Sequence, residues 1–587
     1  MGAFFIYDKD KIHNPNLALD MFVEMGFSTP ITIEIGVWKI YAYPKMALSN
    51  PNTISNNGYV LVSAGTPIYK GLDYANSLAS LLLDFQIGKI DMKQLIGQYT
   101  ILFCHDDCIE VLCDPLGSKH LFTDNKHSML SSHMLPVAQC FDDDIHINRK
   151  AIYEKFLTGI IMTPNTIFEE IIQIDKSTAE CINHDGIGIK FIQTDSISES
   201  ETCPKGLNEC LAEQAENLQE YFQLLSNSGK DGIDIGLSGG YDSRLVLACL
   251  NRFSKGKIHL HSHATENDHQ KELSIAKKMA DYVGVPCHVV NTKKLSHCSH
   301  VDEVLQKSIL YFDGRSSFSI GGCGEVYTAS YRKDSTEKIP FTISGVGGEL
   351  YRNIFDIGFR KIRFDHFIDG KVFSQSFQKA MPDGLFRETR NEIIRKAAAR
   401  LEIDPTSRQS KKIAHRYYCE IMMPDGQGVA LDAYNQVSCC IAPFLEPRII
   451  AKGYEAIPYH CSGGEFEGKL INLIDSGLAA IWSIYGYPIG KRPLRAKVKE
   501  RLRTVISTSV WDKLANGCFK KKNLFSMEIA LRELYANSQV MEKAFLFLTE
   551  LLPEINFTYM LRRNEDIRRV QFIAMVLYKF RERIKMN

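Results

Sequence analysis

The sequence predicts an α/β protein: a mixed α/β part, then a parallel sheet with a helical extension. Three observations support this. Before about residue 193, short apolar runs rich in β-branched and aromatic residues alternate with turn signals, as at 59–62, 99–103 and 108–112. After residue 207, buried-type strands alternate with amphipathic helices, the pattern of a parallel sheet. Beyond about Asn353 the pattern is mostly helical to the end.

Individual elements follow from the same patterns. Helices are expected at 78–85 and 149–156 among the N-terminal strands. In the second part we expect, in order, a helix over 207–225, a strand over 233–237, a helix from about Ser243, a strand over 258–262, a helix over 270–283 and a strand over 288–291. The polar stretch 194–206 lacks periodicity and reads as a linker. We therefore predict domains at 1–193 and 207–587.

Composition excludes several classes of protein. The 587 residues carry 69 Lys and Arg against 69 Asp and Glu, so the formal net charge is zero and no basic domain for nucleic acid is indicated. No apolar stretch approaches the ~18 residues that span a bilayer, and the first residues lack the features of a signal peptide. The 16 cysteines form no Cys-x-x-Cys pair. We expect a cytoplasmic protein with reduced cysteines.

The most informative segment is Leu237-Ser238-Gly239-Gly240-Tyr241-Asp242-Ser243. It lies between a predicted buried strand and a predicted helix. Glycines allow close backbone approach, and the free N–H groups and dipole of a helix start attract anions, so the segment is typical of a phosphate-binding loop. It is not a Walker A loop, because the Gly-Lys-Ser/Thr ending is missing. The alternative is a glycine-rich turn followed by an Asp/Ser helix cap.

Asp242 indicates the chemistry of this loop. A carboxylate that faces a polyphosphate is repelled unless a divalent cation lies between them. Mg²⁺ is the cation that carboxylates and phosphates most often share. The segment therefore predicts a site for ATP with Mg²⁺.

Ser238-Gly239-Gly240-x-Asp242-Ser243 resembles the pyrophosphate loop of N-type ATP pyrophosphatases, and further segments resemble the asparagine synthetase family. The C-terminal half contains five such segments. Ile258–Ala264 is similar to the strand whose end contacts adenine, and Ser344–Leu350 is similar to Ser-Gly-x-Gly-x-Asp-Glu. Ala442–Glu446 is similar to Pro-Phe-Leu-Asp, and Lys491–Arg495 and Lys522–Phe525 are similar to two basic motifs.

The N-terminal half resembles the same family. Gly97-Gln98-Tyr99, the hairpin Asp114–Phe122 and the closing segment Thr166–Ile171 match in order. The resemblance implies an N-terminal glutaminase-like (Ntn-type) sandwich domain of two sheets flanked by helices. It implies a C-terminal adenine-nucleotide α-hydrolase-like parallel sheet with a helical extension.

The resemblance also implies roles for individual residues. ATP and its pyrophosphate would be bound by Leu237, Ser238, Gly239, Gly240, Asp242, Ser243, Ser262, Gly345, Gly347 and Gly348. Asp242 and Glu349 would bind Mg²⁺, and Glu349 and Lys522 would serve catalysis, with Lys522 stabilising the transition state of amide formation.

Four positions depart from the family pattern. Residue 2 is Gly2 where glutamine-dependent members have the nucleophilic cysteine, so the glutaminase is expected to be inactive, as in β-lactam synthetases and lasso-peptide cyclases. Val346 stands where an acid is usual and cannot take a proton. Glu349 replaces an aspartate. Arg244 replaces a small polar residue, and either a phosphate clamp or a helix-surface ion pair fits it.

The expected function is ATP-dependent adenylation of a carboxylate, followed by amide formation with an amine that does not come from glutamine. The expected partners are small-molecule or peptide carboxylates and amines, and a homodimer is left open. Two alternatives remain: a glutamine-hydrolysing asparagine synthetase, and a nucleotide-binding pseudoenzyme scaffold. Asp313-Gly314-Arg315 is compatible with a substrate cleft or with a turn that carries an ion pair.

Overall fold

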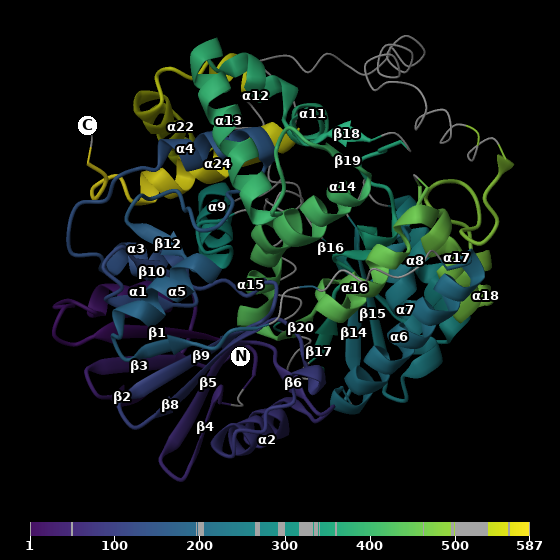
Figure 1. Cartoon of the computed structure of the whole chain (residues 1–587), viewed down its shortest axis with the longest axis horizontal. Coiled ribbons are helices and arrows are strands. Elements are labelled where there is room, and N and C mark those ends of the chain that lie inside the picture. Colours follow the sequence, from purple (N-terminus) through teal and green to yellow (C-terminus); the bar gives the residue numbers. More distant parts are fainter. Residues whose placement is uncertain are drawn as a thin grey trace.

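The computed structural model describes residues 2–48, 51–194, 197, 205–229, 231–264, 270–291, 300–315, 333, 339, 341–358, 361–461, 463–494, 498, 538–561 and 564–585. Within these ranges the chain forms two β-rich regions, with helices packed around and between them (Figure 1).

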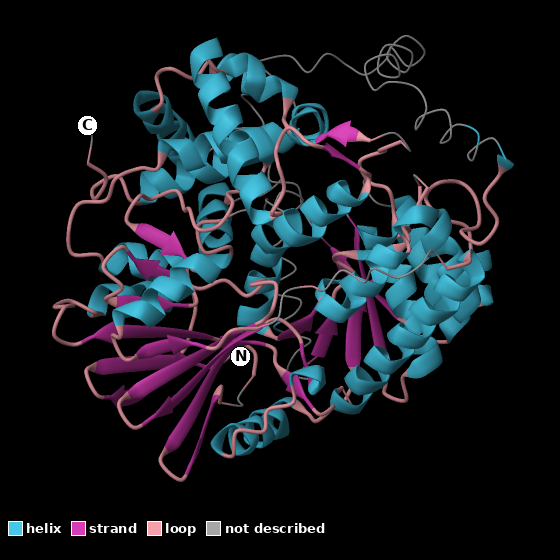
Figure 2. Ribbon diagram, viewed as in Figure 1, coloured by secondary structure: helices cyan, strands magenta, loops and turns pink. Residues whose placement is uncertain are grey.

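The N-terminal region is a pair of stacked sheets (Figure 2). The first sheet has the order β12-β10-β11-β1-β3-β2, and the second has the order β13-β9-β8-β5-β4. The strands are β1 (Ala3–Asp8), β2 (Ile31–Ile35), β3 (Trp38–Tyr43), β4 (Thr53–Asn56), β5 (Tyr59–Gly65), β8 (Tyr99–His105), β9 (Cys108–Cys113), β10 (Phe122–Asp124), β11 (Met129–Ser131), β12 (Ile171–Gln173) and β13 (Ile189–Phe191).

Strand alternation explains this stacking. Phe4 and Ile6 of β1 belong to one apolar cluster with Leu102 of β8, between the two sheets. Their neighbours Phe5 and Phe103 belong to the other cluster, on the outer faces. Successive side chains of a strand point to opposite faces, so each sheet buries both of its faces.

Helices cover the outer faces. Phe22 of α1 (Asn16–Glu24) stacks on Tyr43 of the first sheet at 4.3 Å between ring centroids. Phe85 of α2 (Tyr74–Gln86) stacks on Phe103 of the second sheet at 3.9 Å. The region therefore has the helix–sheet–sheet–helix layering expected from the sequence. Its assignment as a glutaminase-like domain stays a prediction.

The C-terminal region contains a five-stranded sheet with the order β16-β15-β14-β17-β20. Its strands are β14 (Ile233–Gly236), β15 (Ile258–Ala264), β16 (Cys287–Asn291), β17 (Phe341–Ile343) and β20 (Cys439–Ile441), and all neighbouring pairs are parallel. The prediction of a parallel sheet is confirmed. The helices α6 (Leu207–Ser228), α7 (Asp242–Phe253) and α8 (Gln270–Val283) lie where the sequence predicts them.

The remaining helices surround the sheet and extend towards the N-terminal region (Figure 1). The main ones are α4 (Arg149–Thr158), α9 (Val301–Tyr311), α13 (Asp383–Arg400), α14 (Lys412–Tyr417), α15 (Gly428–Val437), α16 (Pro447–Glu455), α17 (Glu465–Ile474), α18 (Ser476–Ala480), α22 (Gln539–Leu551) and α24 (Asn564–Lys579). The chain end returns to the N-terminal region, where Ile584 forms a β-bridge with Ile145. No helix within the described ranges is long and apolar enough to cross a membrane.

Buried polar contacts join the two regions. The side chain of Gln98 pairs with the backbone of Ala442: its Oε1 accepts the N–H at 2.9 Å and its Nε2 donates to the carbonyl at 3.2 Å. Gly97 donates its N–H to Glu446 Oε1 at 2.6 Å. Lys45 donates to Ser438 O at 2.7 Å. Two of the segments that resemble the family, Gly97–Tyr99 and Ala442–Glu446, therefore meet at this interface.

Glu446 makes the stability of this interface depend on pH. Burial raises the pKa of its carboxyl from 4.5 to about 7, against the lowering effects of Arg448 and of the N–H of Gly97. The folded protein therefore keeps a proton that the unfolded chain has already released. Stability should fall as pH rises through this window, because the folded state binds more protons there.

We predict that Glu446→Gln removes this dependence. Each unit of pKa shift corresponds to about 1.4 kcal/mol, so between pH 5 and pH 8 the wild type should lose a few kcal/mol of unfolding free energy relative to the variant. Urea unfolding of both proteins at several pH values measures this difference in unfolding free energy. The exposed Glu388→Gln serves as the control. Parallel pH profiles for wild type and Glu446→Gln would contradict the prediction.

Candidate functional site

The phosphate loop connects β14 to α7 as predicted. Ser238 donates its N–H to Ser243 Oγ at 3.0 Å, and its own hydroxyl lies 3.1 Å from the same oxygen, so the loop is closed on itself. The helix that follows is buried from Ser243 to Leu250. The start of α7, where backbone N–H groups lack helical partners, therefore lies at the carboxyl edge of the sheet.

The second loop lies directly beside the first. β17 pairs in parallel with β14, with Ile343 opposite Ile235, so both strands end at the same edge. A Cβ atom on Gly348 would lie 2.3 Å from Asp242 Oδ1. Gly347 adopts φ +92°, which favours glycine. The two loops that resemble the family thus come into contact at Asp242.

Arg352 joins the two predicted metal ligands. Its Nη2 lies 2.5 Å from Asp242 Oδ1 and 3.4 Å from Glu349 Oε1. Glu349 also accepts a hydrogen bond from Tyr418 Oη at 2.7 Å. The structure therefore brings together Asp242 and Glu349, as the sequence predicts, and adds a guanidinium that sequence reasoning missed.

A third carboxyl group lies at the same place. Glu467 of α17 is fully buried, and its Oε2 lies 3.2 Å from Arg352 Nε. Burial, and then the nearby Asp242, raise the pKa of Glu467 well above its usual range. Burial, and then Glu349, raise the pKa of Asp242 to about 6, although Arg352 opposes this. Glu467 has no local sequence signal, because it is 225 positions from Asp242.

The residues fit a divalent cation only in part. Carboxylate oxygens are the donors that Mg²⁺ prefers, and it usually takes one or two carboxylates together with substrate phosphates. In the part of the chain that the structure describes, no three His, Cys, Asp or Glu side chains are arranged as a metal-binding group. Asp242 and Glu349 would therefore hold Mg²⁺ together with the phosphate oxygens of a nucleotide.

Both interpretations of Arg244 are wrong. Its side chain is fully buried, and its hydrogen bonds go to backbone carbonyls of the segment 478–482. It donates to the carbonyl oxygens of Leu478 at 3.0 Å, Ile481 at 2.6 Å and Trp482 at 3.2 Å. Arg244 therefore caps the carboxyl end of α18, where carbonyls lack helical partners.

Three other predicted positions take structural contacts. Ser262 Oγ donates to Leu237 O at 2.9 Å and ties the ends of β15 and β14 together. Val346 is half-buried and packs against the apolar core. Asp313 accepts the N–H groups of Met134 and Leu135 at 2.5 and 2.9 Å, so it caps α3 (Met134–Cys140). A nucleotide-binding role for Ser262 and Leu237 stays a prediction.

Arg315 lies in an ion network and not beside the phosphate loop. Its Nη2 is 2.9 Å from Asp432 Oδ2, and Asp432 also contacts Lys119 at 2.9 Å and His120 at 2.5 Å. Although burial opposes ionisation, Lys119, His120 and Arg315 hold the pKa of Asp432 well below its usual range. These contacts match the interpretation of Asp313–Arg315 as a turn with ion pairs, and Gly314 and Arg315 also line the cavity described below, so the interpretation as a substrate cleft stays a prediction.

Some predicted residues lie outside the described ranges. These are Lys522 with the basic segment around it, Arg495, and most of the linker 194–206. Lys491 and Arg492 are described, and Arg492 lies over the ring of Tyr487 at 5.8 Å. Nothing about the position of Lys522 relative to the two loops follows.

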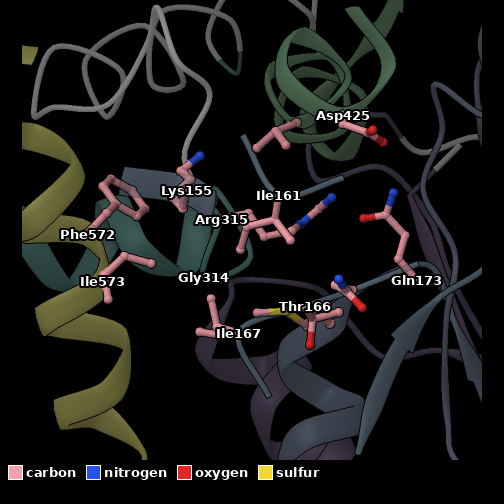
Figure 3. A pocket seen from close by; sticks show the side chains of 13 residues that line it. Lys155, Ile161, Thr166, Ile167, Gln173, Gly314, Arg315, Asp425, Phe572 and Ile573 are labelled. Atoms are coloured by element: carbon pink, nitrogen blue, oxygen red, sulfur yellow. The ribbon is translucent and has the colours of Figure 1, made fainter. Parts of the chain in front are cut away.

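A small cavity of about 40 Å³, open to solvent on one side, lies between the N-terminal region and the helices that follow (Figure 3). Figure 3 shows Lys155 and Arg315 on its wall, with Phe572 and Ile573 of α24 at one side. None of the residues predicted to bind nucleotide lines it. The cavity is therefore separate from the phosphate loop.

The fold and site define a class of protein: a parallel-sheet unit with a glycine-rich loop at a helix start, an arrangement suited to an anion such as phosphate. Residues 234–318 match the family model described as Asparagine synthase, a stretch that runs from β14 past α9 and includes the first loop. This match supports a place in the asparagine synthetase family. It ends before the second loop and does not define a subtype.

Among solved structures, the chain is similar to a glutamine-dependent NAD+ synthetase from Acinetobacter baumannii in complex with adenosine diphosphate. The identity is 14%, the TM-score is 0.18, and the match covers 43% of this chain and 51% of that one. The similarity thus spans about half the length of that protein, and such a TM-score does not establish a common fold. No curated protein sequence matches this chain.

We predict that Gly348→Ala weakens binding of ATP with Mg²⁺. The added methyl group would collide with the Asp242 carboxylate, and such overpacking costs about 1–3 kcal/mol, which corresponds to an affinity loss of roughly tenfold to a hundredfold. Isothermal titration calorimetry measures it. Gly384→Ala, on a helix with open space around the added methyl group, is the control. Equal affinities for the two variants would contradict the proposed contact between loops and nucleotide.

Proposed function

We propose that this chain uses ATP to adenylate a carboxylate, releases pyrophosphate, and forms an amide with an amine that does not come from glutamine. The observation that supports this proposal most directly is the contact between the two glycine loops at Asp242. Glu349 and the start of α7 lie on the same sheet edge. The substrates are proposed to be small-molecule or peptide carboxylates and amines.

In the first half-reaction the protein binds and orients. Free N–H groups at the start of α7 hold the pyrophosphate portion of ATP, and Asp242 and Glu349 hold Mg²⁺. Mg²⁺ held by these residues would supply the charge neutralisation that attack of the carboxylate on the α-phosphorus requires. No side chain needs to move a proton in this step. Ser238, Gly239, Gly240, Ser243, Gly345 and Gly347 are assigned to the same binding surface.

In the second half-reaction the amine attacks the adenylate, AMP leaves, and the oxyanion at the tetrahedral carbon needs a nearby positive charge. Lys522 is assigned this role on the resemblance of its segment to the family. Val346 offers no base, because its side chain carries no proton-accepting atom.

The surroundings of Gly2 support an amine other than glutamine-derived ammonia. Gly2 is buried, and a Cβ there would lie 1.9 Å from Tyr43 O and 2.5 Å from Pro44 O. A cysteine side chain therefore has no room at this position without a shift of the backbone. This opposes the alternative of a glutamine-hydrolysing asparagine synthetase.

A nucleotide-binding scaffold without chemistry is the second candidate. The observation that favours it is the ion pair between Arg352 and Asp242, since a carboxylate held by a guanidinium is less available to a metal. Product formation separates the two candidates. AMP and pyrophosphate from ATP in the presence of a carboxylic acid support the enzyme, and ATP binding without turnover over a broad panel of acids supports the scaffold.

We predict that Asp242→Asn abolishes carboxylate-dependent exchange between ATP and pyrophosphate. The variant loses one negative charge that a divalent cation needs. Asp383→Asn is the matched control, because Asp383 is also the first residue of its helix and is exposed. In a separate assay, the wild-type protein should release no glutamate from glutamine. ADP as the product, or glutamine hydrolysis stimulated by ATP, would contradict the proposal.

We predict that Lys522→Met keeps ATP binding and lowers amide formation by about 10²–10³, the usual cost of one preorganised group that stabilises an oxyanion. Methionine retains the apolar stem and deletes the charge. Lys520→Met, in the same charge run, should be nearly silent. Single-turnover product formation measures both. Equal losses in the two variants would show that Lys522 is wrongly assigned.

A further inference from the structure

Arg352 is placed to control access to the proposed metal site. It follows the short 3-10 helix η3 (Gly348–Tyr351) of the second loop, and its side chain is 14% exposed. One nitrogen, Nη2, contacts both Asp242 and Glu349, at 2.5 and 3.4 Å. The guanidinium carbon also lies 5.9 Å from the centre of the Tyr241 ring. The side chain is thus held between the first loop and the second.

Glu467 fixes the other end of this guanidinium. Arg352 Nε lies 3.2 Å from Oε2 of the fully buried Glu467, and Glu467 also interacts with Asp242. A buried carboxyl group without polar partners is costly, so Glu467 favours the guanidinium at this position. Arg352 is therefore tied to α17 through Nε, while Nη2 lies between the two loop carboxylates.

In this arrangement the guanidinium of Arg352 competes with a divalent cation for Asp242 and Glu349. Asp242 and Glu349 supply the hard oxygen donors that the metal prefers, but a positive group of the chain already lies between them. A cation that approaches without nucleotide meets the repulsion of the guanidinium. The triphosphate of ATP changes this balance, because it offers the guanidinium anionic oxygens of its own.

We propose that Arg352, anchored by Glu467, makes divalent-metal binding depend on nucleotide binding. Without nucleotide, Arg352 is the counter-ion of Asp242 and Glu349 and keeps the metal out. When the nucleotide enters, Arg352 exchanges these carboxylates for phosphate oxygens, and the metal takes its place between them. Arg352 is a positioning residue in this scheme, which rests on the proposed nucleotide site.

The test measures Mn²⁺ binding to the full chain without nucleotide, from the electron paramagnetic resonance signal of free Mn²⁺. Wild type should bind weakly, and Arg352→Gln should bind about tenfold more tightly or better, because the competing charge is gone. Arg352→Lys keeps a cation and should stay near wild type. Arg390→Gln, which removes a similar ion pair with Asp369, is the matched control and should also stay near wild type.

A second measurement adds α,β-methylene-ATP. Wild type should now bind Mn²⁺ well, and its difference from Arg352→Gln should shrink. If Arg352→Gln does not fold because Glu467 loses its partner, the double variant Arg352→Gln/Glu467→Gln makes the same comparison without the buried carboxyl group. Wild-type Mn²⁺ affinity in the folded Arg352→Gln or double variant would overturn the proposal.

The outcome is separable from that of the proposed function. Tight Mn²⁺ binding by Arg352→Gln, with no adenylation by wild type, would support control of metal binding by Arg352 and refute the proposed ligase function. Adenylation by wild type, with unchanged Mn²⁺ affinity in Arg352→Gln, would refute only the proposed role of Arg352.

Discussion

The close approach of the second loop to Asp242 is the constraint on which the rest of the site depends. β14 and β17 are parallel neighbours, so the segments that follow them must emerge at the same edge. A Cβ at position 348 would lie 2.3 Å from Asp242 Oδ1, so a side chain there would displace the carboxylate. The position of Glu349 then follows, because it is the next residue in the chain. The metal end of the proposed site is thus set by backbone packing before any ligand binds.

The interface between the two regions explains why several family-like segments persist far from the phosphate loop. Gln98 pairs with Ala442, Gly97 with Glu446, and Lys119 and His120 with Asp432. Each is a polar contact in a buried setting, where removal of one partner leaves the other unsatisfied at a cost of about 1–3 kcal/mol. Such contacts penalise any relative displacement of the two regions. This gives the N-terminal sandwich a structural role that does not require a nucleophile at residue 2.

Much of the fold could be predicted from the sequence, because local periodicity carries the information. The helix over Gln270–Val283 has the expected bounds, and β14 ends one residue before the expected Leu237. The first loop was identified for a similar reason, because glycines between a strand and a helix start have few uses, and the second was identified from its resemblance to the family motif. Arg244 shows where this reasoning stops. Its position in the chain suggests phosphate, yet its direction is set by α18, more than 230 residues away.

Arg352 and Glu467 escaped prediction for a related reason. Neither lies in a motif, and Glu467 comes into contact with the loops only through the packing of α17 against α7 and α6. A buried ion pair between distant residues has no local pattern in the sequence. Arg352 and Glu467, together with Asp242 and Glu349, are the acidic and basic side chains described at the proposed metal site. The motifs identify only the last two.

The two proposed half-reactions make different demands on the chain. Attack of a carboxylate on the α-phosphorus needs charge neutralisation and alignment, and the groups assigned to this step all lie within the described residues around Asp242. Amide formation also needs removal of a proton from the amine, and Val346 cannot accept one. The group that completes the second step must therefore come from outside the two loops.

The basic segment that contains Lys522 can supply positive charge for the oxyanion, but a protonated lysine does not accept a proton. The substrate amine must be neutral when it attacks, and the proton that it then loses goes to the departing phosphate, to water or to a base outside the two loops. The departures at Val346 and Gly2 both support the proposal that the amine of the second step does not come from glutamine.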